Sequence, residues 1–107
     1  MSLDVWLSKP MPTDVFTGNC THNLSQMAEA AGLYRPCWRP DVLGVTKAGE
    51  LIPLLQAGLE QLKSDPEHFK TFTPANKWGS YESLVSFVEG YLQACITHPD
   101  ATVQVGR

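Results

Sequence analysis

Apolar residues alternate with polar ones at both ends of the chain, whereas the middle repeats its apolar residues every three or four positions. The alternating apolar positions are Leu3, Val5 and Leu7 at the start and Ala101, Val103 and Val105 at the end. A period of two predicts a β-strand, and a period of three to four predicts a helix. Two short strands alone are marginally stable in water. The two ends should therefore belong to one small sheet that packs against the helices between them.

Three segments are predicted to be helical: residues 23–31, 48–64 and 80–98. Thr21 or Asn23 is the expected N-cap of the first, and Gly32 its stop. Ser80 is the expected N-cap of the third, which Pro99 ends.

The predicted order is strand, helix, helix, helix, strand, with room for an extra short strand near residues 15–18. We expect a single α+β domain over residues 1–107, with a small antiparallel sheet that includes both terminal strands and three helices against one face. A chain of 107 residues supports one modest core. Gly58, on the apolar face of the second helix, predicts the close approach of another element.

Composition and charge exclude several classes of protein. The net charge of −3 argues against binding to duplex nucleic acid through phosphate contacts. The chain has no apolar run of the ~20 residues that a membrane helix needs, and its start lacks the features of a secretory signal. Three cysteines, an odd number, are typical of a reducing compartment. The expected location is the cytoplasm.

Catalytic and metal-binding signatures are weak. The sequence has no Gly-rich phosphate loop, no Gly-X-Ser-X-Gly, no His-Glu-X-X-His and no Cys-X-X-Cys motif. The zinc-type ligands match no familiar spacing; they are Cys20, His22, Cys37, Cys95 and His98. We therefore expect neither an enzyme nor a metal or other cofactor.

Basic residues stand where helices begin. Lys47 and Lys77 each precede a predicted helix, whose N-terminus favours anions and disfavours cations. Free amides at a helix start, together with a Lys or Arg, form a phosphate or carboxylate site. The alternative is that exposed lysines tolerate this position, at a cost of only about 0.3–1 kcal/mol.

Aromatic and polar residues flank these cations. Trp38, between two arginines, can stack on a ligand ring, or it can plug the edge of the core with its indole N–H bonded to the backbone. Trp78 can offer an aromatic surface or staple a helix start. The polar residues 18–23 can bind a small molecule or cap the first helix. The candidate ligand-binding residues are Asn19, Thr21, His22, Asn23, Arg35, Trp38, Arg39, Lys47, Lys77, Trp78, Ser80 and Tyr81.

Five stretches carry a resemblance to a known group. They are residues 4–7, 18–25, 47–55, 78–81 and 103–107. In this order they resemble small, mostly uncharacterised proteins encoded by bacteriophages and prophages, although Gly106 stands where a serine is expected. The resemblance implies recurring polar positions at Asn19, Thr21 and Asn23, and a location in an infected or lysogenic bacterial host. By analogy it also implies inhibition of a host component or sequestration of a nucleotide defence signal.

The leading hypothesis is therefore a non-catalytic, anti-defence protein that binds a small anionic, nucleotide-like ligand. The alternative is an inhibitor of a host protein that uses its aromatic loops as anchors, and an enzyme is the least favoured reading. We expect no membrane partner. Pairing of terminal strands across a two-fold axis would give a homo-oligomer.

Overall fold

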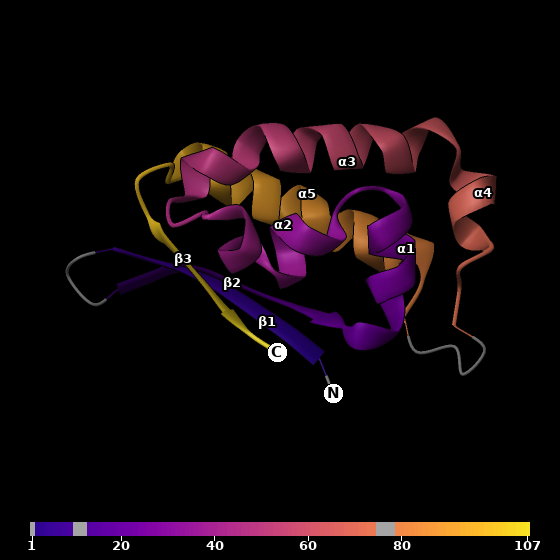
Figure 1. Cartoon of the computed structure of the whole chain (residues 1–107), viewed down its shortest axis with the longest axis horizontal. Coiled ribbons are helices and arrows are strands. Elements are labelled where there is room, and N and C mark those ends of the chain that lie inside the picture. Colours follow the sequence, from indigo (N-terminus) through magenta and orange to yellow (C-terminus); the bar gives the residue numbers. More distant parts are fainter. Residues whose placement is uncertain (1, 10–12, 75–78) are drawn as a thin grey trace.

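A computed structural model describes residues 2–9, 13–74 and 79–107. Three strands form one antiparallel sheet in the order β2-β1-β3; they are β1 (Ser2–Lys9), β2 (Thr13–Thr21) and β3 (Thr102–Gly106). Both terminal strands belong to this sheet, with β1 in its centre (Figure 1). The predicted α+β class is confirmed. Because β1 has a neighbour on each side, it cannot pair with a second copy of the chain. Of the two terminal strands, only β3 lies at an edge of the sheet, where the predicted pairing across a two-fold axis could occur.

The extra strand is much longer than residues 15–18. β2 has nine residues and pairs with β1 from the Ser2–Thr21 pair to the Lys9–Thr13 pair. Its register shifts between Leu7 and Ser8, so its apolar and polar residues do not alternate regularly. The polar residues up to Thr21 therefore belong to strand β2, and not to a loop that leads into the first helix.

The helical segments lie between β2 and β3. They are η1 (His22–Leu24), α1 (Ser25–Ala30), α2 (Tyr34–Trp38), η2 (Pro40–Leu43), η3 (Ala48–Leu51), α3 (Ile52–Ser64), α4 (Pro66–Lys70) and α5 (Tyr81–Thr97). The three predicted helices correspond to η1 with α1, η3 with α3, and α5. The predicted stop at Gly32 is confirmed, with a left-handed φ of 77°.

The sequence reading missed the shortest helices. α2 contains Pro36 and spans five residues, too few for a hydrophobic period to be visible. α4 begins at Pro66, where proline is tolerated, and the Asp65 side chain accepts a hydrogen bond from the N–H of His68. α4 therefore begins at a side-chain cap, whereas α2 has none and instead buries Pro36, Cys37 and Trp38.

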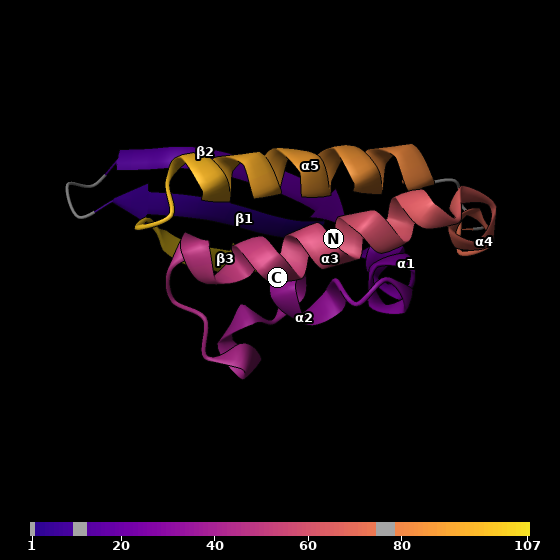
Figure 2. The ribbon, with the colours of Figure 1, turned by 90° about the horizontal axis from the view of Figure 1, so that it is seen from above.

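The helices cover one face of the sheet (Figures 1 and 2). Leu3, Val5 and Leu7 point into this core and are at most 1% exposed. On the helix side, the Tyr91 ring of α5 stacks on Phe16 of β2, with 5.7 Å between the ring centres. Burial of these side chains supplies the main driving force for joining the two layers.

The close approach predicted at Gly58 is confirmed. A Cβ atom at this position of α3 would collide with the side chain of Leu33, which is fully buried just before α2. Only glycine leaves room for that contact. Within the described residues, no helix combines the length and apolarity needed to cross a lipid bilayer.

Candidate functional site

Trp38 does not offer a stacking surface. Its side chain is 2% exposed, and its ring stacks on Tyr34 at 5.8 Å between centres. The indole Nε1–H donates to Nδ1 of His22 over 2.9 Å. The ligand-stacking role predicted for Trp38 is wrong. The alternative, a plug at the edge of the core, is confirmed by its burial, but the indole N–H bonds to a side chain and not to the backbone as expected. A buried indole must bond its N–H, and His22 supplies the acceptor.

The polar residues before α1 mostly satisfy one another. Asn19 donates from Nδ2 to Oδ1 of Asp4 over 2.7 Å and to Oγ of Ser2 over 3.0 Å. Thr21 Oγ1 accepts from the backbone N–H of Asn23 over 3.3 Å and from its Nδ2 over 3.2 Å. The helix-capping alternative is thus confirmed for Thr21, and Asn19 forms cross-strand contacts.

The backbone N–H groups beside Lys47, before η3, bond to a carboxylate of the chain itself. The Glu50 carboxylate accepts from the N–H of Thr46 over 2.8 Å and from the N–H of Lys47 over 3.1 Å. These two hydrogen bonds lower the pKa of Glu50. The anion expected at this helix start is therefore part of the chain itself, and the external anion site predicted at Lys47 is wrong.

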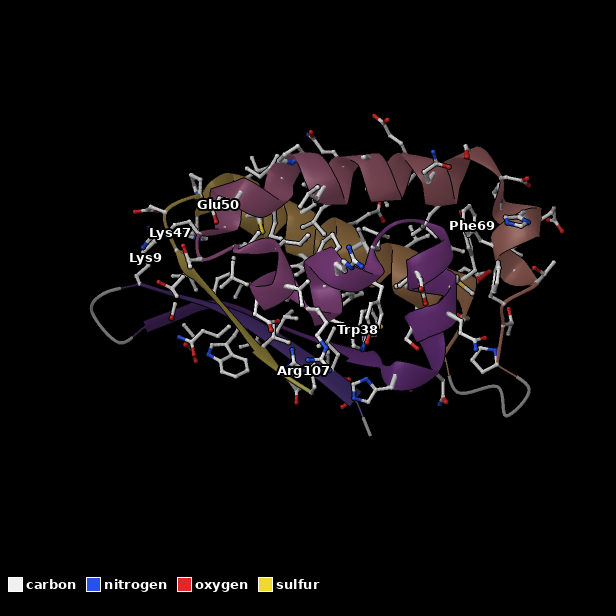
Figure 3. All side chains as sticks on the ribbon, in the orientation of Figure 1. Lys9, Trp38, Lys47, Glu50, Phe69 and Arg107 are labelled. Carbon is white, nitrogen blue, oxygen red and sulfur yellow. The ribbon has the colours of Figure 1, made fainter. Side chains whose placement is uncertain are left out.

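Arg35, Arg39 and Lys47 do not line one common hollow among those described. Lys47 lies beside Lys9 and Glu50, at the opposite end of the molecule from Phe69 (Figure 3). Arg35 borders a small hollow of about 230 Å³ together with Glu29, Gly32 and Tyr34. Arg39 is exposed before η2. Neither Arg39 nor Lys47 lines the hollow that Arg35 borders.

At the start of α5, the predicted ligand-binding residues Ser80 and Tyr81 form hydrogen bonds within the chain. Ser80 Oγ accepts from the N–H of Ser83 over 3.1 Å, which confirms Ser80 as the N-cap. The Tyr81 hydroxyl donates to the carbonyl oxygen of Leu62 over 2.7 Å, and Lys70 lies 5.6 Å from the centre of its ring. The predictions for Lys77 and Trp78 lie outside the described residues.

A hollow lies between the start of α1 and the segment after α4. It has a volume of about 420 Å³, and we call it the His22 cavity. The lining residues are His22, Asn23, Ser25, Gln26, Thr71, Phe72, Thr73 and Pro74. Two predicted residues, His22 and Asn23, therefore lie together here, and the other described candidates do not line this cavity.

The lining of the His22 cavity is polar and uncharged when His22 is neutral. Nδ1 of His22 accepts from Trp38, so in the neutral ring the proton lies on Nε2, which can donate to a ligand. Thr71 and Thr73 donate their hydroxyl protons to the carbonyl oxygens of His68 and Lys70, so their oxygens are left as acceptors. Among the described lining residues there is no Lys, Arg, Asp or Glu. The cavity suits a ligand with several hydrogen-bonding groups.

The three cysteines are buried in the core. Burial raises the pKa of Cys20 and of Cys95 to about 12, and it raises the pKa of Cys37 further. A thiol with such a pKa is protonated at neutral pH and is a weak nucleophile. Within residues 2–9, 13–74 and 79–107, no three His, Cys, Asp or Glu side chains gather as metal ligands would.

The sequence reading missed six of the eight lining residues. In α1, Ser25 is half-exposed and Gln26 is exposed. Residues 71–74 follow α4, a helix that was not predicted. Nothing in the sequence pairs two segments almost fifty positions apart. No family model, curated protein or solved structure matches the chain.

Proposed function

We propose that this chain is a non-catalytic protein that binds a small, polar, ring-bearing ligand of nucleoside or nucleotide type in the His22 cavity. The observation that carries the proposal is the concentration of uncharged donors and acceptors around one hollow of about 420 Å³. Ligand cavities typically have volumes of about 300–1,000 Å³ and position a few polar groups to orient the ligand.

The lining contains groups of the kinds that a nucleobase requires. Gln26 supplies both an amide donor and an acceptor, Ser25 supplies a hydroxyl, and His22 supplies its Nε2–H. Phe72 adds an aromatic wall. Capture of such a ligand without turnover would be sequestration, the role implied by the resemblance to small phage proteins.

The structure changes what we expect of the ligand's charge: the cavity offers no described cation to bind a phosphate. Arg35 and Lys47, which were expected to neutralise an anion, do not line the His22 cavity. A nucleotide phosphate would therefore extend beyond the described lining, and the base and sugar would make the contacts that supply affinity.

A second candidate function is inhibition of a host protein. Val42 and Leu43, on η2, are 61% and 41% exposed. Among the exposed large apolar side chains of the described residues, these two are adjacent in the sequence. Exposed apolar patches often mark protein interfaces. The anchors of such an interface would be aliphatic rather than the buried Trp38.

A thermal-shift screen with adenosine, guanosine, their monophosphates and a cyclic nucleotide tests the proposed function. A bound ligand at about 100 times its Kd stabilises the folded state by about 2.7 kcal/mol and raises Tm by several degrees. Gln26→Ala should abolish that shift, because Gln26 lines the cavity. Gln56→Ala is the matched control, since Gln56 is an exposed glutamine of α3 that does not line it.

The two arms of the screen separate the contributions of base and phosphate. We expect nucleosides to shift Tm nearly as much as their monophosphates do. No shift with any compound, or equal shifts in the Gln26→Ala and Gln56→Ala variants, would contradict the proposal.

A further inference from the structure

The outer edge of β3 is only half covered. Its first part pairs with a short extended segment: the N–H of Val103 donates to the carbonyl oxygen of Thr46, and the N–H of Ala48 donates to that of Ala101, each over 2.9 Å. The neighbouring segment then turns away, because the N–H of Val45 donates instead to the carbonyl oxygen of Pro40. β3 itself continues to Gly106.

The remaining part of this edge presents unpaired backbone groups. In an antiparallel sheet, successive residues of a strand direct their N–H and C=O groups to opposite sides. Because the N–H of Val103 faces away from β1, the N–H and C=O of Val105 face the same way. Among the described residues, neither group has a backbone partner. An unpaired edge of this kind is a template for another strand.

A hollow lined by aliphatic and charged side chains lies directly at this edge. It has a volume of about 290 Å³, and Pro40, Val45, Val103 and Val105 line it. Asp41 and Arg107 complete the lining; the Arg107 guanidinium is fixed by the Trp38 carbonyl oxygen at 2.9 Å and by Asp41 at 3.4 Å. Trp38 and Arg107 lie close together in Figure 3. We call this hollow the β3 groove.

We propose that an extended segment of a partner protein adds to the sheet at Val105 and places an aliphatic side chain in the β3 groove. The segment would continue the antiparallel ladder that Thr46 and Lys47 begin. Its backbone would accept from the N–H of Val105 and donate to its C=O, and its side chain would bury the apolar walls. Peptide recognition by strand addition combines these two contributions.

The geometry favours a flexible segment over a second copy of this chain. η2 lies beside the β3 groove and contributes Pro40 and Asp41 to its lining. A folded sheet edge would have to pass η2, whereas a single extended segment can lie between η2 and β3.

NMR titration of the whole chain with a defined peptide tests this proposal. The probe is acetyl-Lys-Thr-Val-Thr-Val-Thr-Lys-amide, which alternates as a strand does. We expect amide shifts confined to residues 40–47 and 102–107, with slower hydrogen exchange at Val105. Two control peptides carry N-methyl groups, one on its valines and the other on its threonines. Only one of these sets can face β3, so one control should bind about tenfold more weakly than the other.

Variants of the chain supply the matching test. Val105→Pro removes the outward N–H without removing a hydrogen bond to β1, and proline is tolerated at such edge positions. We expect it to weaken binding about tenfold. Val45→Thr makes one wall of the groove polar and should also weaken binding, whereas Val42→Thr, outside the lining, should not.

Several outcomes would overturn the inference. These are the absence of shifts at about 1 mM probe, shifts centred on β2, equal binding of the two N-methylated peptides, and self-association of the chain through residues 102–107. Equal affinities of the Val45→Thr and Val42→Thr variants would do the same. The β3 groove shares no lining residue with the His22 cavity, so either proposal can fail while the other stands.

Discussion

The hydrogen bond from Trp38 to His22 joins α2 to the segment that follows β2. Because Trp38 is 2% exposed, its indole N–H depends on His22 as the acceptor. Leaving a buried donor unpaired costs about 1–3 kcal/mol. The same bond places the proton of the neutral His22 ring on Nε2, the atom proposed to contact the ligand. His22 therefore contributes both to the stability of the fold and to the proposed ligand contact.

We therefore expect His22→Ala to lower the free energy of unfolding by about 1–3 kcal/mol. In a Trp38→Phe background the donor is absent, and the same substitution should cost much less. Urea unfolding of the four proteins of this double-mutant cycle measures the difference. An equal cost of His22→Ala in both backgrounds would show that the bond does not contribute.

Tyr91 and Tyr81 form a contrasting pair on α5. The Tyr91 hydroxyl is buried, and among the described residues it has no hydrogen-bond partner, whereas the Tyr81 hydroxyl donates to the carbonyl oxygen of Leu62. Burial raises the pKa of Tyr91. Tyr91→Phe should stabilise the protein by about 1 kcal/mol, because an unsatisfied polar group disappears.

Tyr81→Phe should instead destabilise the protein by about 1 kcal/mol, because it leaves a carbonyl group without its donor. Chemical denaturation of both variants tests the pair. A loss of stability in Tyr91→Phe equal to that in Tyr81→Phe would mean that the Tyr91 hydroxyl has a partner in solution.

At the level of elements, the start of η3 is stabilised by the chain's own carboxylate. The pKa of Glu50 lies below its ordinary value of 4.5, since the ionised form accepts two backbone hydrogen bonds. A lowered folded-state pKa means that the contribution is complete above pH 4.5 and is lost as the pH falls through the folded-state value.

Glu50→Gln should therefore lower Tm at neutral pH, and the difference from the unsubstituted protein should vanish in acid. Thermal unfolding between neutral pH and about pH 3 follows this trend. Glu60→Gln is the control, because Glu60 is an exposed glutamate of α3, away from the start of η3. A Tm difference for Glu50→Gln that is independent of pH would contradict this account.

The contact between α3 and the α1–α2 connection depends on Gly58. Gly58→Ala should destabilise the protein by about 1–3 kcal/mol, because the buried Leu33 side chain would have to move. Gly90→Ala, within α5, meets no atom within 4 Å and should stabilise the protein by up to about 1 kcal/mol through helix propensity. Denaturant unfolding measures both changes, and the same sign for the two substitutions would contradict the packing described.

For the whole molecule, periodicity predicted the layers but not the site. The alternation at Leu3, Val5 and Leu7 identified a strand with one buried face, and the stripe that contains Leu84, Val88 and Tyr91 identified α5, because burial imposes those periods. β2 was predicted only as a short strand near residues 15–18, because its register shift interrupts the alternation.

The site could not be predicted in the same way, because it depends on contacts between distant segments. Trp38 and His22, sixteen positions apart, meet only in the folded chain. One signal was available: Glu50 stands three residues after Lys47, the spacing at which a carboxylate commonly caps a helix start. That spacing favours an internal anion over an external one.

The most direct test of the proposed function is a map of the amide shifts that adenosine or its monophosphate produces in the whole chain. The account predicts shifts concentrated at residues 22–26 and 71–74, which are lost in Gln26→Ala and retained in Gln56→Ala. Shifts centred on Arg35 or Lys47, or no shifts at all, would contradict it.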